Sequence, residues 1–194
     1  SVRFNNNSQN PSVLNRTVSF TASNLAGAGN TATKTVLVVA INDAPVVTTS
    51  SGVTTFTEPG GLAAITSANG VAVDSNLTIT DVDSTNLIGA TIAITGGSTG
   101  DTLGFVNQNG ITGSLNLGGD VLTLTGSATV ANYQAALRSI VFYNTSHDPL
   151  AGNRTVGFQV NDGAAANNLS TVANKTVNLV ATNNSWGGGG FSQG

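Results

Sequence analysis

Two stretches of the chain are similar to each other: SVRFNNNSQNPSVLNRTVSF at residues 1–20 and SIVFYNTSHDPLAGNRTVGF at residues 139–158. The two copies align without a gap at an offset of 138 residues, and identical residues recur along them. These include Phe4 and Phe142, Pro11 and Pro149, and the run Asn-Arg-Thr-Val that begins at Asn15 and at Asn153. After a three-residue slip, Lys34-Thr35-Val36 matches Lys175-Thr176-Val177. The period of about 140 residues is the size of one domain.

The repeat predicts how the chain is organised. Residues 1–41, here called the partial repeat, are expected to be the last three strands of one unit. Residues 42–182, the whole repeat, are expected to form a complete unit, and residues 183–194 are a Gly-rich tail. Tandem arrays of such units act as stalks or filaments.

Composition excludes several classes of function. Charged residues make up only 8% of the chain and hydrophobic residues 39%, with a net charge of −3 at pH 7. The pI of about 4.7 gives no reason to expect a nucleic-acid partner. No apolar run approaches the ~18 residues of a membrane span, so we expect no membrane insertion. The absence of Cys and Met fits an extracellular protein.

The hydrophobic pattern indicates strands throughout. Apolar and β-branched residues alternate with polar ones, and Gly, Asn and Ser punctuate the chain about every ten residues. The predicted strands are residues 16–22, 33–41, 46–49, 53–57, 71–80, 89–95, 110–115, 121–125, 139–143, 154–161 and 173–181. Residues 128–138 are the one stretch with helical character. We predict an all-β sandwich with Phe20, Phe142 and Phe158 in its core.

Several short motifs, taken in order, resemble a known family. They are Ala40-Ile41-Asn42-Asp43-Ala44-Pro45, Thr57-Glu58-Pro59, Thr80-Asp81-Val82-Asp83-Ser84, residues 121–138, and the Val-Asn-Asp-Gly of residues 160–163. This series is similar to the bacterial cadherin-like modules of large surface adhesins. The resemblance implies a Greek-key, immunoglobulin-like or cadherin-like β-sandwich with calcium between consecutive repeats. It also implies a role in adhesion, or in spacing an adhesive tip from the cell.

The residues predict the calcium site independently. If each strand crosses the sandwich and reverses, the linker, the loop after the strand at 71–80 and the loop after the strand at 154–161 meet at one end. The predicted ligands at that end are Asn42, Asp43, Asp81, Asp83 and Asp162. Calcium binds 6–8 oxygen ligands of these types. The alternative is that each Asp serves only its own turn, as we expect for Asp74 and Asp120.

Glu58 is expected at the opposite end of the whole repeat, beside the next linker. That linker lacks an acid, since Asn183-Asn184-Ser185-Trp186 replaces Asn42-Asp43-Ala44-Pro45. We therefore do not predict a filled site there, even with Asp101 and Asp148 nearby. The partial repeat also departs from the pattern, with Asn24 in place of Asp162.

Catalysis is not expected. The one histidine, His147, has Gln9 as its counterpart in the partial repeat, and there is no Cys. We predict a structural or adhesive repeat at the outside of a bacterial cell, with neighbouring repeats, copies of itself, or a cell-surface or matrix ligand as partners. Two alternatives stay open: a carbohydrate-binding or surface-binding module, and a calcium-independent filament subunit that assembles by strand complementation.

Overall fold

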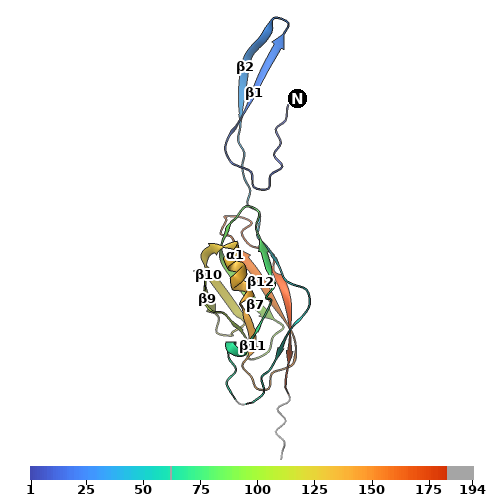
Figure 1. Ribbon diagram of the computed structural model, residues 1–194, viewed down its shortest axis with the longest axis vertical. Helices are drawn as coiled ribbons and strands as arrows, with labels where there is room; N and C mark the ends of the chain where they lie inside the picture. The colour runs from blue at the N-terminus through green and yellow to red at the C-terminus, as the bar shows by residue number, and fades with distance from the viewer. Residues whose placement is uncertain (62, 183–194) are drawn as a thin grey trace, which may run out of the picture.

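The computed structural model describes residues 1–61 and 63–182, and nearly all of the regular secondary structure within them is β-strand (Figure 1). The elements in chain order are β1 (Arg16–Asn24), β2 (Gly27–Val36), β3 (Val46–Thr48), β4 (Thr54–Thr57), a 3-10 helix (Ser67–Asn69), β5 (Val71–Ala72), β6 (Thr78–Thr80), β7 (Asn86–Thr95), β8 (Asp101–Gly104), β9 (Thr112–Leu115), β10 (Val121–Thr129), α1 (Val130–Arg138), β11 (Val141–Asn144), β12 (Gly152–Asn161) and β13 (Ala173–Val180). The expected tail lies outside the described residues.

The whole repeat folds as a β-sandwich. Its larger sheet has the strand order β4-β13-β12-β7-β10-β9, and its smaller sheet has the order β5-β11-β8. The strands β3 and β6 form a separate antiparallel pair, in which Val46 lies opposite Thr80. Phe56 of the larger sheet meets Phe142 of the smaller one edge-on, with ring centroids 5.6 Å apart. The predicted all-β sandwich is confirmed, whereas its Greek-key connectivity stays a prediction.

The core follows from the two-residue period of the strands. In β12, Val156, Phe158 and Val160 are fully buried, and the residues between them are half-buried. Val177 and Leu179 of β13 are buried in the same alternation. Successive side chains of a strand point to opposite faces, so one face of this hairpin faces the smaller sheet.

The helix α1 closes one side of this core. Thr129 caps its amino end by accepting a hydrogen bond from the Asn132 backbone N–H at 3.2 Å. Tyr133, Ala136 and Leu137 form its buried face. The Tyr133 hydroxyl donates to the Gly126 carbonyl at 2.6 Å, and burial raises the pKa of that hydroxyl. The predicted helical stretch is therefore confirmed as one short helix.

The partial repeat forms only a hairpin, β1 with β2, which projects from one end of the sandwich (Figure 1). Residues 1–15 contain no strand, so the third expected strand is not formed. Its counterpart β11 pairs with β5 and β8, for which residues 1–41 have no equivalent. The prediction that Phe20 lies in the core was wrong: it is 43% exposed. The strands that cover its counterpart Phe158 are missing around it.

Candidate cation site at the repeat junction

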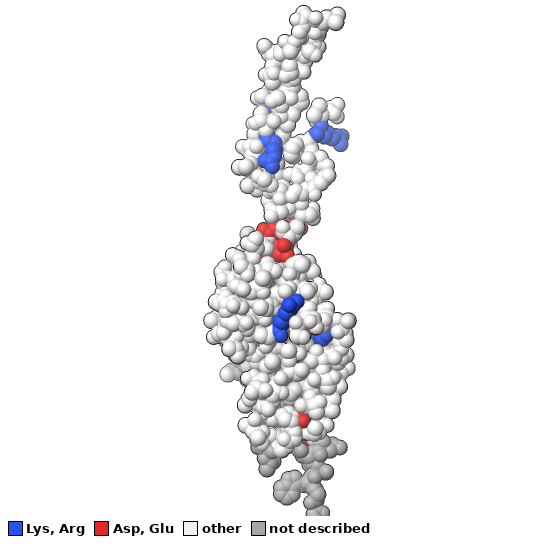
Figure 2. All heavy atoms as spheres, viewed as in Figure 1, with Lys and Arg blue, Asp and Glu red and all other residues white. Residues whose placement is uncertain are grey.

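Acidic residues gather where the partial repeat meets the sandwich. Figure 2 shows their red atoms at the narrow waist between the two parts, with blue Lys and Arg side chains above and below it. Three segments meet there: the linker ahead of β3, the loop after β6 and the loop after β12. The antiparallel pairing of β3 with β6 brings the first two together, because Val46 lies opposite Thr80.

The linker is hydrogen-bonded to both acidic loops. The Asp43 backbone N–H donates to Asp83 Oδ2 at 3.0 Å. The Asn42 side-chain amide donates to Asp162 Oδ2 at 2.8 Å, and the Ser84 hydroxyl is 3.4 Å from the same oxygen. The structure therefore brings all five predicted residues to one end of the whole repeat.

Asp81 shapes its own loop with one carboxylate oxygen. Asp81 Oδ1 accepts from the backbone N–H groups of Asp83 at 3.1 Å and Ser84 at 2.8 Å. This is the turn chemistry that Asp commonly supplies. It uses only one oxygen, so the turn role and a ligand role are compatible in the same residue.

The remaining oxygens of the loop are buried without hydrogen bonds. Asp81 Oδ2 and Asp83 Oδ1 have no hydrogen-bond partner among the described residues. A buried, unpaired carboxylate oxygen is unfavourable, because nothing replaces the water it has lost. A cation in contact with both oxygens would remove that penalty, so the residues present fit a hard metal ion.

The electrostatics of the loop agree with this fit. Burial raises the pKa of the Asp81 carboxyl above its usual value, and the neighbouring Asp83 carboxylate raises it further. Two acids this close repel one another when both are ionised. A divalent cation between them would favour the ionised forms.

The acids alone do not enclose an ion. Within residues 1–61 and 63–182, no group of three or more His, Cys, Asp or Glu side chains is arranged to hold a metal. Calcium would therefore need ligands from Asn42, backbone carbonyls and water as well, which are usual calcium ligands. Calcium binding by these five residues stays a prediction.

Sequence reasoning missed Asn167, which holds the linker. Its side-chain amide donates to the Asn42 carbonyl at 3.0 Å, and the Asn42 amide donates to the Asn167 carbonyl, also at 3.0 Å. Asn167 has a positive φ of 53°. Asn is one of the few residues that adopt this conformation readily, so the Asn pair at 167–168 was the available signal.

Glu58 lies at the other end of the sandwich, as expected. Its carboxylate accepts from the Thr182 hydroxyl and from the Thr182 backbone N–H. Glu58 is only 1% exposed, and its Oε1 lies 4.0 Å from His147 Nδ1. The altered linker that follows begins at residue 183, outside the described residues.

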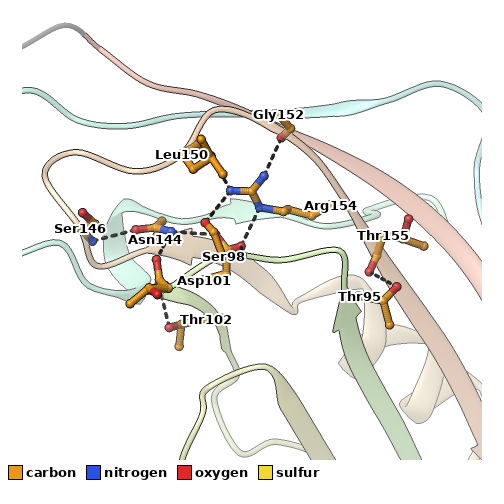
Figure 3. A network of polar contacts seen from close by, with 12 residues as sticks. Thr95, Ser98, Asp101, Thr102, Asn144, Ser146, Leu150, Gly152, Arg154 and Thr155 are labelled. Atoms are coloured by element: carbon orange, nitrogen blue, oxygen red, sulfur yellow. Dashed lines mark hydrogen bonds and ion pairs between the residues drawn. The ribbon is translucent and has the colours of Figure 1, made fainter.

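A second polar centre, which sequence reasoning did not identify, joins the two sheets (Figure 3). The Arg154 guanidinium of β12 donates from Nε to Asp101 Oδ2 of β8 at 2.6 Å. It also donates to the Ser98 hydroxyl at 2.9 Å and to the Leu150 carbonyl at 2.6 Å. Asn144 donates to the other Asp101 oxygen at 2.7 Å. These contacts satisfy a charge pair inside the sandwich.

Comparison with known proteins finds sequence similarity to a curated protein. The chain is 34% identical over 146 residues to Halomucin of Haloquadratum walsbyi, strain DSM 16790. The match covers 72% of this chain but only 2% of halomucin, so the chain spans a very small part of that relative. No protein-family model and no solved structure matches the chain. Among the described residues, no helix has both the length and the apolar character to cross a membrane.

Proposed function

We propose that this chain is a structural repeat of an extracellular protein and that calcium stiffens the junction between its repeats. One observation supports the proposal: three acidic segments meet between the partial and whole repeats. They are the linker, the loop after β6 and the loop after β12. An ion bound there would hold the linker against the loops after β6 and β12. The partial repeat would then bend less freely on the sandwich.

The chemistry of the junction favours calcium over softer metals. Its ligand atoms are carboxylate, amide and carbonyl oxygens, and the chain has no Cys. The one histidine, His147, lies beside Glu58 rather than at the junction. Oxygen-only sites of irregular geometry suit calcium, whereas magnesium needs a near-ideal octahedron.

Sequence similarity supports an extracellular, repeat-built parent protein. The relative carries the name of a mucin, a class of protein found outside cells, and the matched segment is a small fraction of it. The internal repeat of this chain fits the same kind of architecture. We propose a stalk or spacer role, with neighbouring repeats as direct partners and an adhesive ligand elsewhere in the parent protein.

A thermal melt in EDTA and then in excess calcium tests the proposal. We expect calcium to raise the melting temperature, because an ion that binds only the folded form stabilises it. The double variant Asp81→Asn, Asp83→Asn should lose this rise. Asp120→Asn, in a turn of the same repeat, is the matched control and should keep it. If calcium leaves the wild-type melting temperature unchanged, the calcium proposal is wrong.

Small-angle scattering tests the stiffening itself. Calcium should narrow the distribution of distances between the hairpin and the sandwich in the wild-type chain, and not in the double variant. A calcium-dependent melting temperature with an unchanged scattering curve would mean that calcium stabilises the sandwich without stiffening the junction.

A further inference from the structure

The hairpin of the partial repeat is folded in the same register as the last hairpin of the whole repeat. Val18 lies opposite Lys34, as Val156 lies opposite Lys175. Further along, the residues that pair with the two phenylalanines also correspond: Phe20 with Ala32, and Phe158 with Ala173. The hairpin β1–β2 is thus a formed copy of β12–β13.

The copy lacks every strand that surrounds the original. In the whole repeat, β12 pairs with β7 on the edge away from β13, and β13 pairs with β4 on the edge away from β12. In the part of the chain that the structure describes, β1 and β2 pair only with each other. Two open strand edges of this kind accept further strands.

The repeated phenylalanines of the partial repeat are exposed as well. Phe4 is 46% exposed and Phe20 is 43% exposed, whereas their counterparts Phe142 and Phe158 are fully buried. The same side chains therefore form a core in one unit and an open surface in the other. In the whole repeat, residues 42–138 cover the equivalent surface.

The polar centre of the sandwich is also half-formed in the partial repeat. Arg16 donates to the Leu14 carbonyl and, at 3.3 Å, to the Ser12 carbonyl. Arg154, its counterpart, makes the same contacts two and four residues back, to Gly152 and Leu150.

Asn6 repeats the part of Asn144 in this centre. Its Oδ1 accepts from the Ser8 backbone N–H at 2.9 Å, as Asn144 Oδ1 accepts from that of Ser146 at 2.7 Å. The missing components are the Asp101 carboxylate and the Ser98 hydroxyl, which both accept from Arg154 in the whole repeat. Arg154 has Asp101, but Arg16 forms no ion pair within the described residues.

We propose that the partial repeat is a docking surface for the first half of a repeat of this same type. The occupant is a second copy of the segment 42–138. It is not residues 42–138 of the sandwich to which the partial repeat is linked. It would add a β7-like strand along β1, a β4-like strand along β2, and an aspartate to Arg16. This inference rests on the repeat organisation in the proposed function, but not on calcium.

The chain's own residues 42–138 cannot be the occupant. They already enclose the hairpin β12–β13. In addition, the chain leaves that hairpin beside Glu58, at the end of the sandwich opposite the junction. In the partial repeat, Ile41 corresponds to Thr182 and leads directly into the junction. The end of the hairpin β1–β2 is therefore fixed at the junction and cannot reach the far end of the same sandwich.

A fusion tests the docking. A second copy of residues 42–138 is placed ahead of Ser1 of the full chain, so that Arg138 precedes Ser1 as it precedes Ser139 in the whole repeat. Hydrogen exchange of the β1 amides is then measured in EDTA and in calcium. We expect the β1 amides that face the added strand to exchange at least ~100-fold more slowly than in the unfused chain.

Two matched substitutions test the ion pair. In the fusion, Arg16→Gln should lower the melting temperature of the added unit, whereas Arg3→Gln should not, because Val141 occupies that position in the whole repeat. In the unfused chain neither should have an effect. Unchanged β1 exchange in the fusion would overturn the docking, and equal effects of Arg16→Gln and Arg3→Gln would overturn the ion pair. Slowed exchange in EDTA, with no calcium effect on melting, would support docking and contradict the calcium proposal.

Discussion

Asp101 and Arg154 form a buried ion pair that joins the two sheets of the sandwich. Their side chains are 2% and 3% exposed, and the carboxylate and guanidinium are 2.6 Å apart. Asp101 belongs to β8 of the smaller sheet and Arg154 to β12 of the larger one. A buried pair of this kind fixes how two elements align more than it adds to stability, because both charges lose their hydration.

Breaking this pair on one side should be strongly destabilising. Asp101→Asn leaves the Arg154 charge buried without a counter-ion, and we expect a loss of about 3–5 kcal/mol in the free energy of unfolding, measured by urea denaturation. The double variant Asp101→Leu, Arg154→Met should lose less than the sum of its single variants.

The partial repeat offers the control for that experiment. Arg16→Met removes the same residue where no carboxylate is present, and it should change stability by no more than about 0.5 kcal/mol. A loss at Arg16 as large as the loss at Arg154 would contradict the role of the ion pair.

The two phenylalanines Phe158 and Phe20 should differ sharply although they occupy equivalent positions. Phe158 is fully buried, so Phe158→Ala should cost about 3–5 kcal/mol through lost contacts and a cavity. Phe20 is 43% exposed, and Phe20→Ala should cost less than about 1 kcal/mol. Urea unfolding followed by circular dichroism measures both, and equal losses would show that the partial repeat is buried in solution.

The sequence was sufficient to predict the sandwich, the repeat and the meeting of the acidic loops. These features follow from the alternation of apolar residues, which is a local pattern, and from the order of the strands along the chain. The strand β8 was not predicted because Asp101-Thr102-Leu103-Gly104 is too short and too polar to show alternation. The ion pair of Asp101 depends on that strand, so it could not be predicted either.

The predicted strand at residues 71–80 divides into β5 and β6, and Asp74 explains the division. Asp74 accepts from the Ser50 backbone N–H and from the Ser50 hydroxyl, each at 2.7 Å, and from the Asn76 backbone N–H at 3.1 Å. Asp74 is only 2% exposed. Its residue type predicted a plain turn residue, whereas the structure shows a buried side chain that joins two loops by hydrogen bonds. Residue type alone does not show which distant backbone group an Asp will bind.

Asp74 should stabilise the fold at neutral pH and lose that effect in acid. Burial by itself would raise the pKa of the Asp74 carboxyl, but the hydrogen bonds from Ser50 and Asn76 bring it below its usual value of 3.8. A lowered pKa in the folded state means stability that is fully present above the unfolded pKa and lost as the pH falls through the folded pKa.

We therefore expect Asp74→Ala to cost about 1–3 kcal/mol at neutral pH and less as the solution is acidified. Urea titrations at a series of pH values measure the difference between wild type and variant. A difference that stays constant into strong acid would contradict the assigned hydrogen bonds.

Asp81 should show the opposite pH dependence when calcium is absent. Burial, with the neighbouring Asp83, raises its folded pKa above 3.8. The folded chain then holds a proton over a range where the unfolded chain has lost it. Stability from this group is fully present below the unfolded pKa and is lost as the pH rises through the folded pKa. In EDTA, wild type should therefore gain stability relative to Asp81→Asn as the pH falls from neutral into this range.

Calcium should reverse that dependence, since it binds the ionised carboxylate and competes with the proton. In excess calcium, wild type should be more stable than Asp81→Asn at neutral pH and should lose this advantage on acidification. Urea unfolding of both chains, in EDTA and in calcium, gives the two differences directly. Parallel pH profiles in EDTA would show that the Asp81 carboxyl is not buried against Asp83. If the EDTA profiles are as expected but calcium does not reverse the pH dependence, the two acids are buried side by side and calcium does not bind them.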